Sequence, residues 1–340
     1  MPPRQHAHLC EWVNLRGALR IFVFNETGHQ GQDHIRPLHW YSACRLVVEG
    51  GFHPDEITPR PPFKIEQSRG HKNILIYDSS SAGGGEQTVL GGLKTKNVDV
   101  VVNKTGIGPC IAVSHKGVLR AFRNLTNRME EAVGDCTNIH ITYPALVYGY
   151  LVAIRANRRS NLDDPAMMLP AGDEADATDD DVLLRSRAPE GAEPASETAA
   201  TAGSESADGT DAGEVEAADL AIQESGKPTA MVARFHQAMG ELTGRRGVRN
   251  DVSRYEAIAI ALADPAECAC GELLTGFPSS ESPLRFERFF AQIYARYDER
   301  YVYSAPDLKS VTRRLEWSAQ SPALQNELAA ALDYQPRLAA

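Results

Sequence analysis

The chain has 340 residues, and its 35 lysines and arginines against 45 aspartates and glutamates give a formal charge of −10. Residues 163–224 contain 18 of the acidic residues and only two arginines, so the rest of the chain has 33 basic and 27 acidic residues. The acidic total therefore does not exclude a nucleic-acid partner, because a mildly basic balance remains outside that segment.

Nothing in the sequence indicates export or insertion into a membrane. The N-terminal residues MPPRQHAHLCEW lack the apolar region of a signal peptide, and the longest apolar stretch, residues 143–154, is too short to cross a bilayer. The six cysteines follow no disulfide-framework spacing. We expect a soluble, reduced, cytoplasmic protein without a membrane partner.

The first third of the chain is predicted to contain strands, one helix and connectors. Residues 19–26 (LRIFVFNE) are aromatic and β-branched and predict a strand, whereas residues 37–48 have helical spacing and stop at two glycines. The prolines of residues 57–63 predict an extended connector, and residues 72–78 (KNILIYD) predict a second strand. Residues 79–96 are polar and glycine-rich, which is typical of a mobile loop.

The middle of the chain continues the same pattern. Residues 98–102 (VDVVV) and 110–113 (CIAV) predict two strands, followed by a helix over about residues 118–133. The apolar residues 143–156 predict a buried strand. The order helix, strand, strand, strand, helix, strand predicts an α/β fold in which a small mixed β-sheet is flanked by helices.

Residues 157–226 differ in kind from the rest of the chain. They are rich in Ala, Glu, Asp, Ser and Thr, contain no aromatic residue, and cannot bury enough surface to offset the entropy lost on ordering. We expect a disordered acidic insert within one domain, whose two parts are residues 1–156 and residues 227–340.

The part after the insert is expected to be mostly helical. Residues 229–244, 283–301 and 308–319 predict helices, the second of them strongly amphipathic. Residues 254–264 (RYEAIAIALAD) fit a strand or a further helix equally well.

Three residues of the middle segment have the chemistry of a metal-dependent hydrolase. Asp99 lies on one predicted strand, Lys116 ends the next, and Glu130 follows fourteen residues later on the predicted helix. Two carboxylates can hold a divalent ion, and a lysine beside them can orient a water or offset phosphate charge. This arrangement is the one that phosphodiester hydrolysis needs.

Over roughly residues 72–156 the pattern resembles that of the PD-(D/E)XK nuclease superfamily, the restriction-endonuclease-like enzymes. Asp99 matches the first acid and Lys116 the final lysine, but Ser114 stands where the middle acid belongs. One branch of type II restriction enzymes has Ser-x-Lys there and takes its second carboxylate from the next helix, at the offset of Glu130. The resemblance implies Asp99 and Glu130 as metal ligands, Lys116 as the catalytic lysine and Ser114 as a minor contact.

The resemblance also implies a fold, a cofactor and partners. The fold would be a restriction-endonuclease-like core carried by residues 1–156, completed by the mostly helical residues 227–340. The cofactor would be Mg²⁺, with Mn²⁺ as a substitute. The partner would be double-stranded DNA, cleaved in a type II restriction-like or phage-defence role, with a homodimer and a cognate methyltransferase or defence partner as further expectations.

Further polar residues are candidates for the same site. Glu49 could supply the extra helical acid that many of these nucleases have. Arginines and asparagines recur on two neighbouring stripes of the predicted helix, and two lysines precede the Asp99 strand, so all could bind bases or phosphates. These DNA-binding candidates are Arg120, Arg123, Asn124, Asn127, Arg128, Lys94 and Lys96.

Alternative functions remain open at the level of sequence. Ser114 in place of an acid is compatible with a non-catalytic DNA-binding or scaffold protein on a decayed nuclease fold. A structure-specific repair nuclease would share the chemistry and differ in substrate. Cys268-x-Cys270 and the cluster His6-x-His8-x-Cys10 lack the paired spacing of a structural zinc site.

Overall fold

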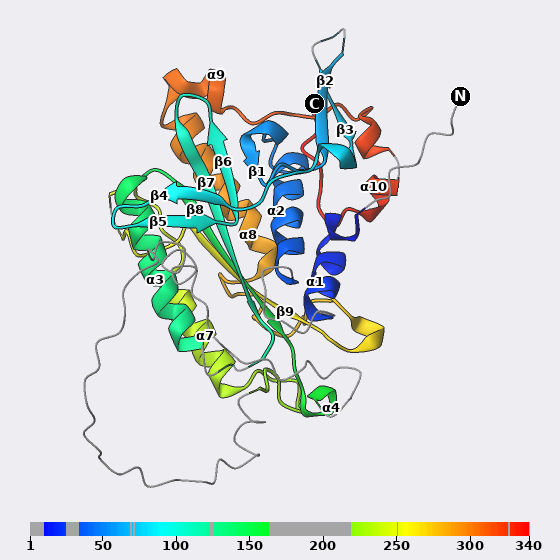
Figure 1. The fold of residues 1–340 in the computed structure, drawn as a ribbon, viewed down its shortest axis with the longest axis vertical. Helices are drawn as coiled ribbons and strands as arrows, with labels where there is room; N and C mark the ends of the chain where they lie inside the picture. The colour runs from blue at the N-terminus through cyan, green and yellow to red at the C-terminus, as the bar shows by residue number, and fades with distance from the viewer. Residues whose placement is uncertain are drawn as a thin grey trace, which may run out of the picture.

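The computed structural model describes residues 10–24, 34–68, 70, 72–120, 122, 125–162, 219–249, 251–325 and 327–339. Its centre is a five-stranded mixed sheet with the strand order β1-β6-β7-β8-β9 (Figure 1). The strands are β1 (Ile57–Thr58), β6 (Val100–Lys104), β7 (Gly108–Val118), β8 (Val147–Arg155) and β9 (Ala257–Ala263). The pairs β1–β6 and β6–β7 are antiparallel, and the pairs β7–β8 and β8–β9 are parallel.

Helices cover both faces of this sheet (Figure 1). One face packs against α1 (Leu15–Val23), α2 (Arg36–Val48) and α8 (Phe286–Tyr297), and the other against α3 (Leu125–Thr142) and α7 (Ala230–Glu241). The sheet therefore separates two hydrophobic cores, and every residue of β8 and β9 is buried. This confirms the predicted α/β class and the small mixed sheet flanked by helices.

Smaller elements surround the sheet. Two hairpins precede β6, the first of β2 (Phe63–Gln67) and β3 (Asn73–Tyr77), the second of β4 (Gln87–Leu90) and β5 (Thr95–Val98). Among the described residues, the remaining α-helices are the short α4 (Arg159–Leu162), α9 (Lys309–Thr312) and α10 (Glu327–Ala331), and a π-helical turn (Asp298–Tyr303) extends α8. Over the described part of the chain, no helix combines the length and apolarity needed to cross a lipid bilayer.

The N-terminal prediction of a strand over residues 19–26 is wrong for residues 19–23, which belong to α1, and residues 25 and 26 lie outside the described residues. Leu15, Ala18, Leu19 and Phe22 are buried at helical spacing in α1, and the Asn14 side chain caps the helix by accepting a hydrogen bond from the Gly17 N–H at 2.8 Å. The aromatic and β-branched residues favoured a strand, but the i, i+3, i+4, i+7 burial of an amphipathic helix decides the conformation.

The glycine-rich residues 79–96, predicted as a mobile loop, contain the β4–β5 hairpin. Its turn is held by Asn138 of α3, whose side-chain oxygen accepts hydrogen bonds from the N–H groups of Leu93 and Lys94 at 2.7 and 3.1 Å. The sequence could not show this partner, which lies more than 40 residues away. The helix that follows begins at Leu125 rather than near 118, because β7 continues to Val118.

The ambiguous residues 254–264 contain strand β9, and the helix predicted over residues 308–319 is wrong beyond the four residues of α9. Trp317 is fully buried in extended chain, where its indole N–H lies 3.0 Å from the carbonyl oxygens of both Val47 and Val48 at the end of α2. The C-terminal segment continues this contact, because the Arg337 N–H also donates to the Val48 carbonyl at 2.9 Å. The C-terminal segment also contacts the start of α1, where the Leu15 N–H donates a hydrogen bond to the Asp333 carboxylate at 3.0 Å.

The segment predicted as a disordered insert, residues 157–226, contains folded residues at both of its ends. Residues 163–218 lie outside the described residues, but the N–H groups of Ala221 and Ile222 both donate to the Asn157 carbonyl at 3.0 Å. Both side chains are buried in the core on the α3 and α7 face. The end of the segment is therefore part of the folded domain.

We expect Ile222→Ala to lower the free energy of unfolding by about 2–5 kcal/mol, because it leaves a cavity in a closed core. Urea denaturation measures the change. Ile141→Ala is the matched control, since Ile141 is 51 % exposed and its truncation should cost much less. Equal stability of the two variants would show that residues 219–226 do not contribute to the core.

A buried ion cluster joins the start of β9 to β8 and to the helices. Arg245 and Arg300 donate to Oε1 of Glu256 at 2.7 and 2.6 Å, and the Tyr148 N–H donates to Oε2 at 2.7 Å. Burial alone raises the pKa of Glu256, but His140, Arg300 and the Tyr148 N–H more than reverse this and hold it at about 2. Glu256 is therefore ionised inside the protein and supplies the counter-charge of Arg245 and Arg300.

We expect Glu256→Gln to cost about 3–5 kcal/mol of unfolding free energy at neutral pH, because two buried arginines lose their counter-charge. The pKa of Glu256 is depressed from 4.5 to about 2, so its stabilising contribution is complete above 4.5 and disappears as the pH falls towards 2. The difference between wild type and variant should shrink over that interval in urea titrations. The exposed Glu224→Gln is the control, and a difference independent of pH would contradict this assignment.

Candidate functional site

Asp99 lies at the junction between β5 and β6, beside the strand β7. Its neighbours Val98 and Val100 are completely buried, which fixes the backbone, and its Oδ2 accepts a hydrogen bond from the His115 N–H at 2.6 Å. Its side chain is 15 % exposed, so part of the carboxylate can be reached by solvent. The aspartate is thus tied to β7 and still accessible.

Strand β7 presents three consecutive polar residues to opposite faces of the sheet. His115 points to the α2 face, where its Nε2 lies 2.8 Å from Ser42 Oγ. Ser114 and Lys116 point to the α3 face, where they contact Tyr148 and Glu131. Alternation along a strand requires this separation, because successive side chains leave the sheet on opposite sides.

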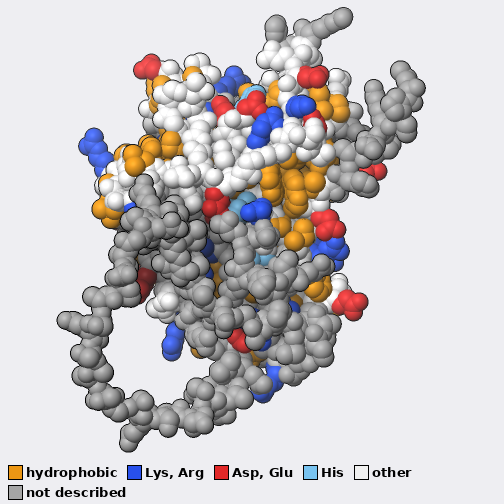
Figure 2. Space-filling model, in the orientation of Figure 1, with side chains coloured by type: hydrophobic (Ala, Val, Ile, Leu, Met, Phe, Trp, Pro, Cys, Tyr) orange, Lys and Arg blue, Asp and Glu red, His pale blue; other side chains and the backbone are white. Residues whose placement is uncertain are grey.

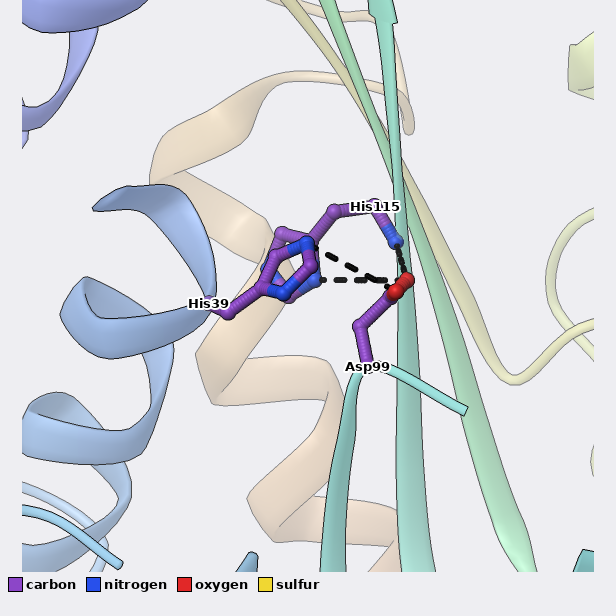
Figure 3. A group of neighbouring side chains, drawn as sticks. All are labelled: His39, Asp99 and His115. Carbon is purple, nitrogen blue, oxygen red and sulfur yellow. Dashed lines mark hydrogen bonds and ion pairs between the residues drawn. The ribbon is translucent and has the colours of Figure 1, made fainter. Parts of the chain in front are cut away.

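On the α2 face, two histidines converge on the Asp99 carboxylate (Figure 3). His39 Nε2 lies 3.6 Å from Oδ1 and His115 Nδ1 lies 3.9 Å from Oδ2, and the two ring centroids are 4.9 Å apart. Burial lowers the pKa of His39 to about 4 and that of His115 well below its ordinary value. Both rings are therefore neutral at pH 7 and each has a nitrogen lone pair.

On the α3 face, Lys116 enters a cluster of alternating charges. Its Nζ lies 2.6 Å from Glu131 Oε1, while Arg128 Nη1 lies 2.9 Å from Glu131 Oε2 and Lys96 Nζ lies 3.0 Å from Asp135. Burial raises the pKa of Glu131, but Lys116, Arg128 and Lys96 more than reverse this and lower it to about 2. Burial lowers the pKa of Lys116, but Glu131 and Asp99 raise it above its ordinary value, so the ammonium stays charged.

The structure brings Glu131 to Lys116, whereas the sequence pattern pointed to Glu130. Glu130 is exposed, and neighbouring residues of a helix are rotated by about 100° about its axis, so the two side chains leave in different directions. The face that a helix presents depends on how the whole helix packs. The offset from Lys116 alone could not decide between the two glutamates.

The other sequence candidates are distributed around this centre. Ser114 is buried and its hydroxyl lies 2.9 Å from the Tyr148 hydroxyl. Glu49 pairs with Arg45 at 2.6 Å near the C-terminal end of α2, about 15 Å along the helix from His39, and so does not join the cluster around Asp99.

The DNA-binding candidates fall into four groups. Lys96 and Arg128 belong to the charge cluster around Glu131, and Arg120 pairs with Asp219 at 3.4 Å. Lys94 and Asn127 are exposed. Arg123 and Asn124 lie outside the described residues.

Sequence reasoning missed His39, Ser42, His115 and Asp135. His115 is enclosed by the Ser-x-Lys pattern, and strand alternation could have assigned it to the opposite face. His39 lies on a helix that the sequence did predict, but its convergence with Asp99 depends on how α2 packs on the sheet.

No family model, curated protein or solved structure matches this chain. The chemistry of the site must therefore be argued from its own geometry. The candidate site has two halves on either side of Asp99. One is the neutral imidazole pair of His39 and His115, and the other is Lys116 with Glu131.

We expect Ser114→Ala and Tyr148→Phe each to cost about 1 kcal/mol of unfolding free energy, because each substitution leaves the other buried hydroxyl without its hydrogen-bond partner. The double variant should cost little more than either single one, since both remove the same hydrogen bond. A double-mutant cycle in urea measures this coupling. The exposed pair Thr88–Asn97, bonded at 2.7 Å, is the control and should show a coupling near zero. Additive losses at Ser114 and Tyr148 would contradict the bond.

Proposed function

We propose that the protein is a metal-dependent nuclease that hydrolyses phosphodiester bonds in DNA. The observation that carries the proposal is the pairing of Lys116 on β7 with Glu131 on helix α3 at 2.6 Å, with the Asp99 carboxylate close enough to raise the pKa of Lys116. The elements α2, β1, β6, β7, α3 and β8 follow one another in the chain, with the hairpins β2–β3 and β4–β5 between β1 and β6. The strand predicted over residues 72–78 is β3, which pairs with β2 outside the central sheet.

The residues on the α3 face suit the handling of a phosphate. Lys116 is charged and held in place by Glu131, and Lys96 and Arg128 lie in the same cluster. The Lys116 ammonium can bind a non-bridging phosphate oxygen or orient a water for attack. The Asp99 carboxylate is close enough to raise its pKa. The side chains of Lys116 and Glu131 are 18 % and 28 % exposed, so a substrate can reach them.

DNA as the substrate is supported by charge rather than by a shaped groove. Outside residues 163–224 the chain has 33 basic and 27 acidic residues. On the face seen in Figure 2, basic and acidic side chains are interspersed without one continuous basic patch. Local cations such as those beside Glu131 would therefore contact the backbone. Double-stranded DNA, a homodimer and a restriction or defence role are part of the same proposal.

The donor groups around Asp99 do not fit Mg²⁺, the ion that the resemblance implies. Mg²⁺ takes oxygen ligands, whereas the atoms nearest the Asp99 carboxylate on the α2 face are imidazole nitrogens. Glu131, the second carboxylate, is engaged by Lys116 and Arg128. The proposed metal dependence is therefore not assigned to Mg²⁺.

A non-catalytic DNA-binding protein is the alternative that a specific observation favours. Each oxygen of Glu131 accepts a hydrogen bond from a cation, as in a purely structural ion pair. Such a protein would bind DNA without cutting it.

We expect the purified protein to cleave supercoiled plasmid DNA when supplied with a divalent ion from a panel of Mg²⁺, Mn²⁺, Co²⁺ and Zn²⁺. Asp99→Asn, Lys116→Ala and Glu131→Gln should each reduce the rate at least about 100-fold, because each removes a charge at the reacting phosphate. Glu130→Gln is the matched control, since it makes the same change one residue away on the exposed face. Gel electrophoresis of the plasmid reads out nicking and linearisation.

Three outcomes would contradict parts of the proposal. Full activity in excess chelator would remove the metal dependence. Loss of cleavage in Glu130→Gln with retention in Glu131→Gln would return the second acid to the position that the sequence pattern gave. Plasmid binding without cleavage under every ion would favour the non-catalytic alternative.

A further inference from the structure

We propose that His39, His115 and Asp99 bind a first-row transition-metal ion that accepts imidazole nitrogen, such as Zn²⁺ or Co²⁺. This inference concerns ion binding alone and holds whether or not the protein cleaves DNA. It shares Asp99 with the proposed nuclease site.

The three ligand atoms are already close to the spacing that such an ion needs. One atom from each residue lies within 4.8 Å of the other two. His39 Nε2 is 3.6 Å and His115 Nδ1 is 3.9 Å from the nearer carboxylate oxygen. Zinc bonds of about 2.0–2.2 Å in a tetrahedral site place ligand atoms roughly 3.3–3.6 Å apart, so side-chain adjustments of less than an ångström suffice.

Both coordinating nitrogens are buried and lack a hydrogen bond. Among the described residues, no hydrogen-bond partner is found for His39 Nε2 or His115 Nδ1, and the two side chains are 5 % and 0 % exposed. A buried polar atom without a partner costs free energy, so native proteins rarely leave one without a reason. Two such atoms aimed at one carboxylate are satisfied together by a single cation (Figure 3).

Neighbouring groups hold the ligands in the orientation that coordination requires. Ser42 Oγ lies 2.8 Å from His115 Nε2, and a hydrogen bond donated by Nε2 leaves the Nδ1 lone pair facing Asp99. The His115 N–H, bonded to Asp99 Oδ2 at 2.6 Å, orients the carboxylate in turn. Such contacts to the ligands commonly change metal affinity by about 10–100-fold.

The donor set selects the class of ion. Two imidazoles and one carboxylate suit zinc, cobalt or ferrous iron, whereas magnesium and calcium prefer oxygen ligands alone. Three protein ligands leave a coordination position for water, as in catalytic rather than structural zinc sites. The Asp99 side chain is 15 % exposed, so solvent can reach its carboxylate.

The experiment is a titration of chelator-treated protein with Co²⁺, followed by its visible d–d absorption, and with Zn²⁺ by calorimetry. We expect one ion per chain, with affinity reduced at least about 100-fold in His39→Gln and His115→Gln and about 10–100-fold in Ser42→Ala. His236→Gln is the matched control, because His236 lies on α7 and pairs with Ser282 at 2.8 Å. Millimolar Mg²⁺ should not displace the bound Co²⁺.

Stability measurements keep the test decisive if a variant folds poorly. Zn²⁺ should raise the melting temperature of wild type and of His236→Gln and leave that of folded His39→Gln unchanged. Unchanged Co²⁺ spectra in both histidine variants would place the ion on other donors, such as Cys268 and Cys270, and overturn the proposal. So would an absence of binding by the wild type. Because no DNA is present, either result leaves the cleavage assay to decide the nuclease proposal separately.

Discussion

The alternation of side chains along β7 is the constraint on which the candidate site depends. His115 and Lys116 are adjacent in sequence, so they must leave the sheet on opposite faces. The imidazole therefore meets α2 and the ammonium meets α3, each in its own core. Asp99, at the junction of two strands, accepts a hydrogen bond from the His115 N–H, and its charge raises the pKa of Lys116. A one-residue shift of register would exchange the two chemistries.

Much of the fold could be predicted from the sequence, and the predictions that were wrong or ambiguous have physical causes. Strands β6 to β8 and helices α2 and α7 were predictable, because their apolar runs and spacing agree with their burial. Strand β9 was ambiguous because it is buried on both faces, which removes the period of two that identifies a half-exposed strand. Trp317 lies in extended chain because it packs on α2 from a distance of about 270 residues along the chain, which no local pattern can show.

The site was predictable only where its residues follow one another along neighbouring strands. Asp99 and Lys116 could be expected near each other because a strand, a loop and a second strand fix their relation. The choice between Glu130 and Glu131 depends on the rotation of α3, which its packing sets rather than its distance from Lys116. His39 joins the site through the docking of α2, which depends on contacts between segments far apart in sequence.

The C-terminal segment contacts α2, which carries His39, so the histidine half of the candidate site depends on a part of the molecule that, among the described residues, the lysine half does not contact. Trp317 and Arg337 donate hydrogen bonds to carbonyl oxygens at the end of α2, whereas Lys116 pairs with Glu131 of α3 on the other face of the sheet. Proteins open in cooperative units rather than uniformly. Local release of the C-terminal segment would loosen the helix that carries His39 and spare the lysine–glutamate pair. The backbone amides of α2, which carries His39, would then exchange with solvent sooner than those of α3, which carries Glu131.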